Sequence, residues 1–169
     1  MPDPTFNITG KIARKYMAHY VDTNFGVDTA SYYRIGKDLE EYTVALNPDV
    51  TVFKNIIGET NMTHNGYERG GSVEPYYCEV GDALFDKLQG FVDTEPTDDT
   101  LKTTVVEVEL FNETTAGSGV FTAYRQPCYI VPTSYGGDTS GYQIPFDIHY
   151  VGDRVAGTFT LSTKTFTPS

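Results

Sequence analysis

Apolar and polar side chains alternate through much of the C-terminal half of the chain. In residues 104–111, three large aliphatic side chains share one face of an extended segment, and a glycine-containing turn follows at residues 116–119. The same period of two continues in residues 120–131, 143–151 and 158–166. Alternation of this kind predicts an antiparallel sheet whose strands are joined by short connections.

One segment has a different period. In residues 82–91, apolar side chains recur at i, i+4 and i+7, at Leu84, Leu88 and Phe91. This single stripe predicts a short α-helix that lies across one face of the sheet. Asp82 is suited to the N-cap of the helix, and Pro96 prevents any continuation beyond it.

The N-terminal half is less regular and contains a long polar segment, residues 55–72. Its strand candidates are residues 16–21, 32–35, 49–53 and 73–77. Between Gly58 and Ser72 the only sizeable apolar side chains are those of Met62 and Tyr67. Long polar loops inside a compact domain are usually functional or disordered, and this one cannot bury a core of its own. We therefore expect a partner to order it.

Length and composition indicate one folded domain, residues 1–169. The apolar fraction of 39% and the charged fraction of 21% exclude a disordered chain. No apolar run approaches the 18 residues of a membrane span, and no N-terminal pattern indicates a secretory signal. The 13 tyrosines and 10 phenylalanines favour pleated sheets.

The chain is strongly acidic. Twelve Lys and Arg residues face 23 Asp and Glu residues, which gives a formal net charge of −11. Residues 79–113 alone hold 10 acidic and 2 basic groups, a net charge of −8. This excess argues against a protein that grips nucleic acid by its phosphates.

Motifs of enzymes and of metal sites are missing from the sequence. His19, His64 and His149 stand in separate segments without metal-ligand spacing, and no P-loop, nucleophile elbow or dinucleotide fingerprint occurs. Two cysteines, Cys78 and Cys128, are too few for a structural zinc site, and the sequence leaves open whether they pair. We therefore expect no catalytic activity, cofactor or metal.

An alternative function is a carbohydrate-binding or adhesin-like β-sandwich module. It depends on surface tyrosines that could stack on sugars, namely Tyr32, Tyr33, Tyr76, Tyr77, Tyr135 and Tyr142. The absence of tryptophan counts against it, because such modules usually present tryptophan platforms.

The order and spacing of several short segments resemble the major tail tube proteins of long-tailed, siphovirus-like bacteriophages. The likeness is strongest between residues 32 and 91. Its parts are YRIGKDL at 33–39, LNPDV at 46–50, IIGE at 56–59, NGY at 65–67 and EVGDALFDKL at 79–88.

This resemblance implies a mainly β fold, an antiparallel β-sandwich or half-barrel with one flanking α-helix and a long extended hairpin loop. It implies a structural protein of the virion tail, assembled in the host cytoplasm into hexameric rings that stack into a tube for genome delivery. Expected partners are copies of itself, the tape measure protein and tail-tip or terminator proteins. DNA is expected to pass without specific binding, because a negative wall repels phosphates. Whether the tail is contractile stays open.

The resemblance also assigns roles to residues. It makes 55–72 the loop that reaches the neighbouring ring and is ordered only in the tube. The expected stacking residues are Asn55, Gly58, Glu59, Met62, Asn65, Gly66, Tyr67, Glu68, Arg69 and Ser72. Met62 and Tyr67 are the expected apolar anchors, because they alone offer much apolar area between residues 58 and 72. Glu107 and Glu109, on one face of a predicted strand, are candidates for the wall of the lumen.

Overall fold

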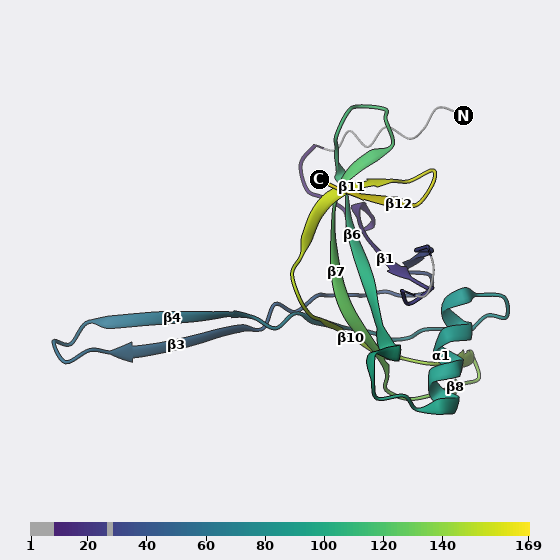
Figure 1. Ribbon diagram of the computed structural model, residues 1–169, viewed down its shortest axis with the longest axis horizontal. Helices are drawn as coiled ribbons and strands as arrows, with labels where there is room; N and C mark the ends of the chain where they lie inside the picture. Colours follow the sequence, from purple (N-terminus) through teal and green to yellow (C-terminus); the bar gives the residue numbers. More distant parts are fainter. Residues whose placement is uncertain (1–8, 27–28) are drawn as a thin grey trace.

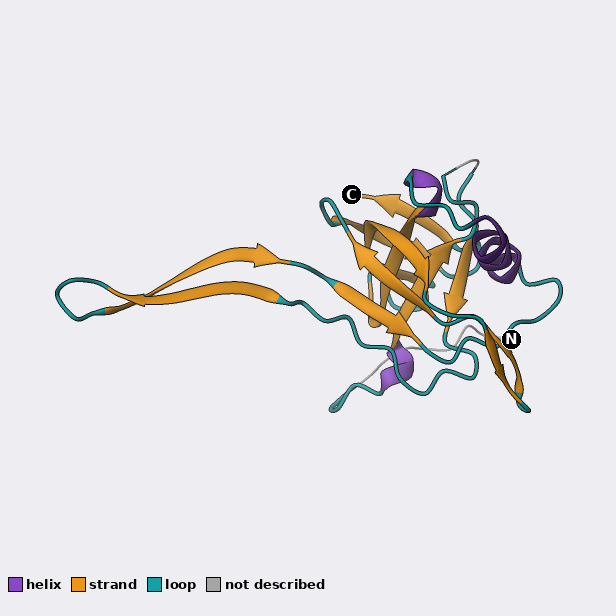
Figure 2. Ribbon diagram, turned by 90° about the horizontal axis from the view of Figure 1, so that it is seen from below, coloured by secondary structure: helices purple, strands orange, loops and turns teal. Residues whose placement is uncertain are grey.

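The computed structural model describes residues 9–26 and 29–169, which form a curled antiparallel sheet, a flanking helix and a projecting hairpin (Figures 1 and 2). The strands are β1 (Met17–Asp22), β2 (Tyr32–Ile35), β3 (Pro48–Lys54), β4 (Thr60–Tyr67), β5 (Gly70–Val73), β6 (Lys102–Glu113), β7 (Val120–Pro132), β8 (Gly136–Asp138), β9 (Gly141–Gln143), β10 (Phe146–Tyr150), β11 (Val155–Thr160) and β12 (Thr165–Pro168). The helices are α1 (Ala83–Thr94) and the 3-10 turns η1 (Arg14–Tyr16) and η2 (Asp99–Leu101).

The main sheet runs in the order β12-β11-β7-β6-β1-β2, and β10 and β5 extend it from the far half of β7. The long strand β7 pairs with β11 through its first half and with β10 through its second half, so the sheet splits and curls there. The rings of Tyr20 in β1 and Phe159 in β11 lie 4.6 Å apart although two strands separate them in the sheet. The sheet therefore closes on itself as a half-barrel, as predicted.

Strands β6 and β7 are buried on both faces. Val106, Val108 and Phe121 pack inside the curl, in a cluster with Tyr20 and Phe159. The opposite face of the same two strands packs in a second cluster with α1, and it includes Val105, Cys128 and Ile130. Burial on both sides explains why the neighbouring residues Val105 and Val106 are both apolar and both buried.

Helix α1 covers the second cluster with the predicted stripe, since Leu84, Leu88 and Phe91 are all buried. Its N-terminus is capped by Asp82, whose carboxylate accepts a hydrogen bond of 3.0 Å from the backbone N–H of Leu84. The helix is longer than predicted and continues to Thr94. It ends where Glu95 adopts a left-handed conformation directly before a proline.

Three sequence-based strand boundaries were wrong. Residues 158–166 form two strands rather than one, because the chain turns between β11 and β12 and pairs Phe159 with Phe166. Pro145 interrupts 143–151, so β10 starts at Phe146. In place of 73–77, the chain has the earlier strand β5, which pairs with β10.

Both cysteines are free in the structure, Cys128 fully buried and Cys78 half-buried. Burial raises the pKa of the Cys128 thiol to about 12, so this group stays protonated and unreactive. Within the described residues, no helix combines the length and apolar character that a membrane crossing needs.

The packing of α1 predicts the effect of truncating its buried stripe. A Leu88→Ala variant should lose about 2–5 kcal/mol of unfolding free energy, because the cavity lies where β7 and the helix meet. Val80→Ala is the matched control, since Val80 is 99% exposed. Urea denaturation measures both, and equal midpoints for the two variants would show that α1 does not cover the core.

Candidate functional site

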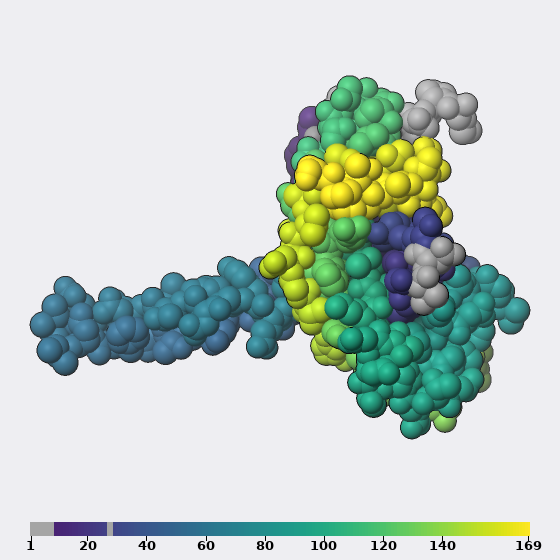
Figure 3. All heavy atoms as spheres, viewed as in Figure 1, coloured from purple at the N-terminus to yellow at the C-terminus, as the bar shows by residue number. Residues whose placement is uncertain are grey.

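The most exposed part of the molecule is a hairpin arm formed by β3, the turn 55–59 and β4. The two strands pair only with each other among the described residues and project from the body along the longest axis of the molecule (Figures 1 and 2). Every residue of β3 is exposed, and so is every residue of β4 except Gly66. In the space-filling view of Figure 3, the arm stands clear of the rest of the chain.

The two faces of the arm differ in character. Opposite residues of an antiparallel pair share a face, and Val52 lies opposite Met62 while Val50 lies opposite His64. These side chains form an apolar face, which we define as Val50, Val52 and Met62. The other face is more polar and holds the pairs Thr51–Thr63 and Phe53–Asn61.

The tip of the arm presents two isoleucines on an ordered turn. The side-chain oxygen of Asn55 accepts hydrogen bonds from the backbone N–H groups of Ile57 (3.2 Å) and Glu59 (2.9 Å). Gly58 has a φ of 83°, a left-handed conformation that glycine adopts without steric cost. Ile56 is 105% exposed and Ile57 is 73% exposed, so the turn is fixed while both of its apolar side chains face solvent.

Exposed apolar area is concentrated on this arm. Of the thirteen large hydrophobic residues that are exposed in the described chain, seven belong to it: Val50, Val52, Phe53, Ile56, Ile57, Met62 and Tyr67. Exposed apolar area concentrated on one projecting element is typical of a site of protein interaction. A lone two-stranded hairpin is also only marginally stable in water, so a docking partner would stabilise the arm as well.

The base of the arm is fixed to the body by Arg69, in the short link between β4 and β5. Its guanidinium donates to the Glu107 carboxylate (Nη2 to Oε1, 3.0 Å) and to the Gln126 side-chain oxygen (Nη1 to Oε1, 2.8 Å). It also lies over the Tyr150 ring, 5.5 Å from the centroid, and the Tyr150 N–H donates to the Arg69 carbonyl at 3.0 Å. Arg69 thus connects the arm to β6, β7 and β10.

Glu107 is shared by two arginines. Its second oxygen accepts from Nη2 of Arg154 at 2.5 Å, and its side chain is only 6% exposed. Arg154 in turn covers the Tyr124 ring, 4.0 Å from the centroid. The buried carboxylate is therefore held by two cations, as a buried charge requires.

The predicted stacking residues occupy different places in the structure. Asn55, Gly58, Glu59, Met62, Asn65, Gly66 and Tyr67 lie in the arm, Glu68 and Arg69 lie at its base, and Ser72 lies in β5. Ser72 pairs with Asp147 in the main sheet. The arm therefore begins earlier and ends earlier than predicted, at Pro48 and Tyr67.

The sequence interpretation missed five apolar residues of the arm, namely Val50, Val52, Phe53, Ile56 and Ile57. The sequence predicts a strand at residues 49–53 but does not show that it belongs to the arm, where Val52 lies opposite Met62 and Val50 opposite His64. The expectation that 55–72 has no order of its own also differs from the structure. Cross-strand hydrogen bonds satisfy its backbone without any core, and β5 belongs to the main sheet.

The two lumen candidates have different environments. Glu107 is buried in its ion pairs and is not available as a wall carboxylate in the free subunit. Glu109 lies on the same face of β6, is half-buried, and accepts a hydrogen bond from Asn112 (3.3 Å). Its role in a wall stays a prediction.

His19 lies beside this network in β1, directly opposite Glu107 across the strand pair. Its ring meets that of Tyr42 edge to face, with the centroids 4.8 Å apart. Burial lowers the pKa of His19 to about 3, and the charges of Arg14, Arg69, Arg154 and Arg34 add to this effect. The histidine is therefore neutral at physiological pH.

The proposed sugar-binding tyrosines do not form one platform. Tyr32 and Tyr76 are buried core residues, and the exposed Tyr142 donates a hydrogen bond to Gln89 while it packs against Phe85. Among the residues that the structure describes, no group of His, Cys, Asp and Glu is arranged to hold a metal ion. The arm and its anchor are thus the strongest candidate site.

No family model and no curated protein matches this sequence. Solved structures do match the fold. The sheath/tube terminator of the extracellular contractile injection system PVC, in its extended state, gives a TM-score of 0.52 at 9% identity, covering 88% of this chain and 98% of that one. A chain of the PVC sheath-tube complex, also extended, gives 0.51 at 9% identity, with coverage of 92% and 96%. This chain therefore shares the fold of structural components of contractile injection particles.

The ion pairs of Glu107 predict that its substitution costs much more unfolding free energy than substitution of Glu109. Glu107→Gln should destabilise the body by about 3–5 kcal/mol, because it leaves Arg69 and Arg154 without their counter-charge. Glu109→Gln is the matched control on the same strand face and should change the urea midpoint little. Similar midpoints for the two variants would contradict the anchoring role of Glu107.

His19 predicts a pH dependence of stability. Between its unfolded pKa near 6.5 and its folded pKa of about 3, the unfolded chain binds more protons, so stability falls as pH falls. The expected loss is about 1.4 kcal/mol per pH unit within that window, relative to a His19→Gln variant. Urea unfolding from pH 6.5 to 4.5 measures the difference, with His149→Gln as the control. Parallel slopes for wild type and His19→Gln would refute it.

Proposed function

We propose that this protein is the subunit of a phage tail tube of the siphovirus-like type, in which hexameric rings stack through the hairpin arm. The observation that carries the proposal is the arm itself, with its ordered tip, its apolar face and its rigid anchor. Its apolar side chains need a partner, and a second ring of the same protein supplies one at every level of a tube.

Closure of the ring uses the edges of the main sheet. Strands β2 and β12 each have one unpaired side within the described part of the chain, and β5 is bridged on its second side only at Gly70, by Ala45. Exposed edges invite pairing with another chain, and a closed ring of subunits removes them. Edge-to-edge joining of six half-barrels would give one continuous inner wall.

The charge of the chain suits a conduit for DNA. A net charge of −11 repels phosphates, so a genome would slide along the wall instead of binding it. Glu109 is a candidate for that wall. In this role the protein belongs to the virion tail, assembles in the host cytoplasm, and meets the tape measure, tail-tip and terminator proteins without performing any catalysis.

A second candidate is a terminator that caps a tube. One structural neighbour is a sheath/tube terminator, which supports this alternative. The two roles differ in the assembly of the purified protein, because a tube subunit adds ring upon ring, whereas a terminator stops at one. Filaments in negative-stain electron microscopy support the tube, and single rings at all concentrations support the terminator.

The arm is tested by replacing residues 50–65 with an Asn-Gly turn between Asp49 and Gly66, which pair at its base. This two-residue loop suits a tight hairpin and leaves Arg69 in place. The urea midpoint of the body should stay unchanged while stacking is lost. Stacked tubes of normal length from this variant would refute the arm as the stacking element.

A matched pair of double variants tests the apolar face. Val52→Glu with Met62→Glu places two charges on that face, and Thr51→Glu with Thr63→Glu places two on the other. The first should raise the protein concentration needed for assembly by at least about tenfold, as expected for residues central to an interface. Light scattering measures the threshold, and equal shifts would show that the faces are not distinguished.

A further inference from the structure

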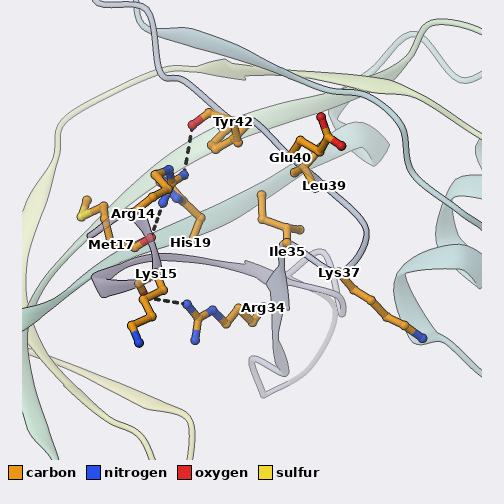
Figure 4. A pocket seen from close by; sticks show the side chains of 11 residues that line it. Arg14, Lys15, Met17, His19, Arg34, Ile35, Lys37, Leu39, Glu40 and Tyr42 are labelled. Carbon is orange, nitrogen blue, oxygen red and sulfur yellow. Dashed lines mark hydrogen bonds between the residues drawn. The ribbon is translucent and has the colours of Figure 1, made fainter. Parts of the chain in front are cut away.

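A cavity of about 500 Å³ opens beside β1 and β2, and four of its eleven lining residues are cations (Figure 4). Arg14, Lys15, Arg34 and Lys37 contribute to it, against a single carboxylate, that of Glu40. Four of the twelve basic residues of an acidic chain thus gather at one cavity. We call this group of four side chains the cationic pocket.

Most of this positive charge is not neutralised within the subunit. Arg14 donates to the carbonyls of Met17 (2.5 Å) and Tyr42 (3.0 Å), and Arg34 donates to that of Lys15 (2.9 Å). Carbonyl groups orient a guanidinium without cancelling its charge. Within the described residues, only Lys37 of the pocket forms an ion pair, with Glu79, and Figure 4 shows its side chain directed away from the other three.

The buried residue at the side of the pocket reports the same positive field. After burial, the next largest cause of the low pKa of His19 is the charge of Arg14, and the charge of Arg34 contributes as well. Three exposed cations in one place, next to a histidine that stays neutral, leave a surface that attracts an anionic group.

The same chain exposes an acidic segment at the end of α1, residues 93–99. Its carboxylates have only uncharged hydrogen-bond donors within the described chain. Gln89 donates to Asp93 (2.9 Å), the N–H of Thr100 donates to Asp98 (2.9 Å), and the Tyr129 hydroxyl donates to Asp99 (2.7 Å). Together with Glu95, all are exposed, so this surface also lacks a counter-charge.

We infer that the cationic pocket of one subunit binds the acidic segment 93–99 of a second copy, as the electrostatic contact between neighbours in the ring. The inference rests on the proposed assembly into rings. Subunits that each carry a charge of −11 repel one another, so association needs a local pairing of opposite charges. Two different complementary patches on one chain form a head-to-tail contact, which closes into a ring when the rotation allows it. A nucleic acid is the weaker occupant, because the overall charge repels it.

Charge reversal on each side tests this contact. The pocket variant carries Lys15→Glu and Arg34→Glu, and the segment variant carries Asp93→Lys and Glu95→Lys. Each should raise the concentration needed for ring formation at least about tenfold, since like charges then face each other. Arg14 is left unchanged because it bonds two carbonyls. Lys102→Glu with Lys164→Glu is a control of equal charge change outside the pocket.

Mixing the two variants gives the decisive result. Each variant retains the patch that complements the reversed patch of the other, so a mixture should form rings of alternating subunits although neither assembles alone. Sedimentation velocity measures the rings, and circular dichroism verifies that both variants are folded. Normal assembly of the separate variants, or no recovery on mixing, would overturn the inference. Tight binding of a short DNA by the wild type that the pocket variant loses would also overturn it. A wild type that forms no ring would refute the proposed function instead.

Discussion

The ion pair between Arg69 and Glu107 is the interaction on which the arrangement of this molecule depends. It joins the last residues of an exposed hairpin to a strand at the centre of the sheet. A buried carboxylate with two arginines is stable only as a complete set, so the body and the arm specify each other's position. The same link is also held by backbone hydrogen bonds, from Tyr150 to Arg69 and between Ala45 and Gly70, so the ion pair adds to a fixed base.

The charged groups fall into two sets, those paired inside the chain and those left unpaired at its surface. Glu107 is neutralised within the chain, whereas Arg14, Lys15, Arg34 and the carboxylates of residues 93–99 have no ion pair among the described residues. The apolar residues divide likewise, with two clusters buried around β6 and β7 and a third group on the arm. Both kinds of uncovered surface support the proposed assembly.

The sequence predicted the class of fold because alternation and the stripe of α1 are local signals. Leu84, Leu88 and Phe91 could be placed on one helix face without any knowledge of the sheet. The limits of the arm could not, because Val50 and Val52 alternate just as a strand of the body would. Glu107 was misread for a related reason: the pattern gives its face on β6, but only tertiary structure shows that Arg69 and Arg154 arrive there from distant segments.

The rigid root of the arm also has a mechanical meaning. A strand of seven residues such as β3 spans about 23 Å, so the arm is a lever with its fulcrum at Arg69. A lateral force on Ile56 or Ile57 becomes a torque on β6 and β7, where the side chains are packed on both faces and yield little. In a stack of such subunits, the resistance to bending would depend on how firmly each arm is held at Arg69. A weaker ion pair at that position would then make the proposed tube more flexible.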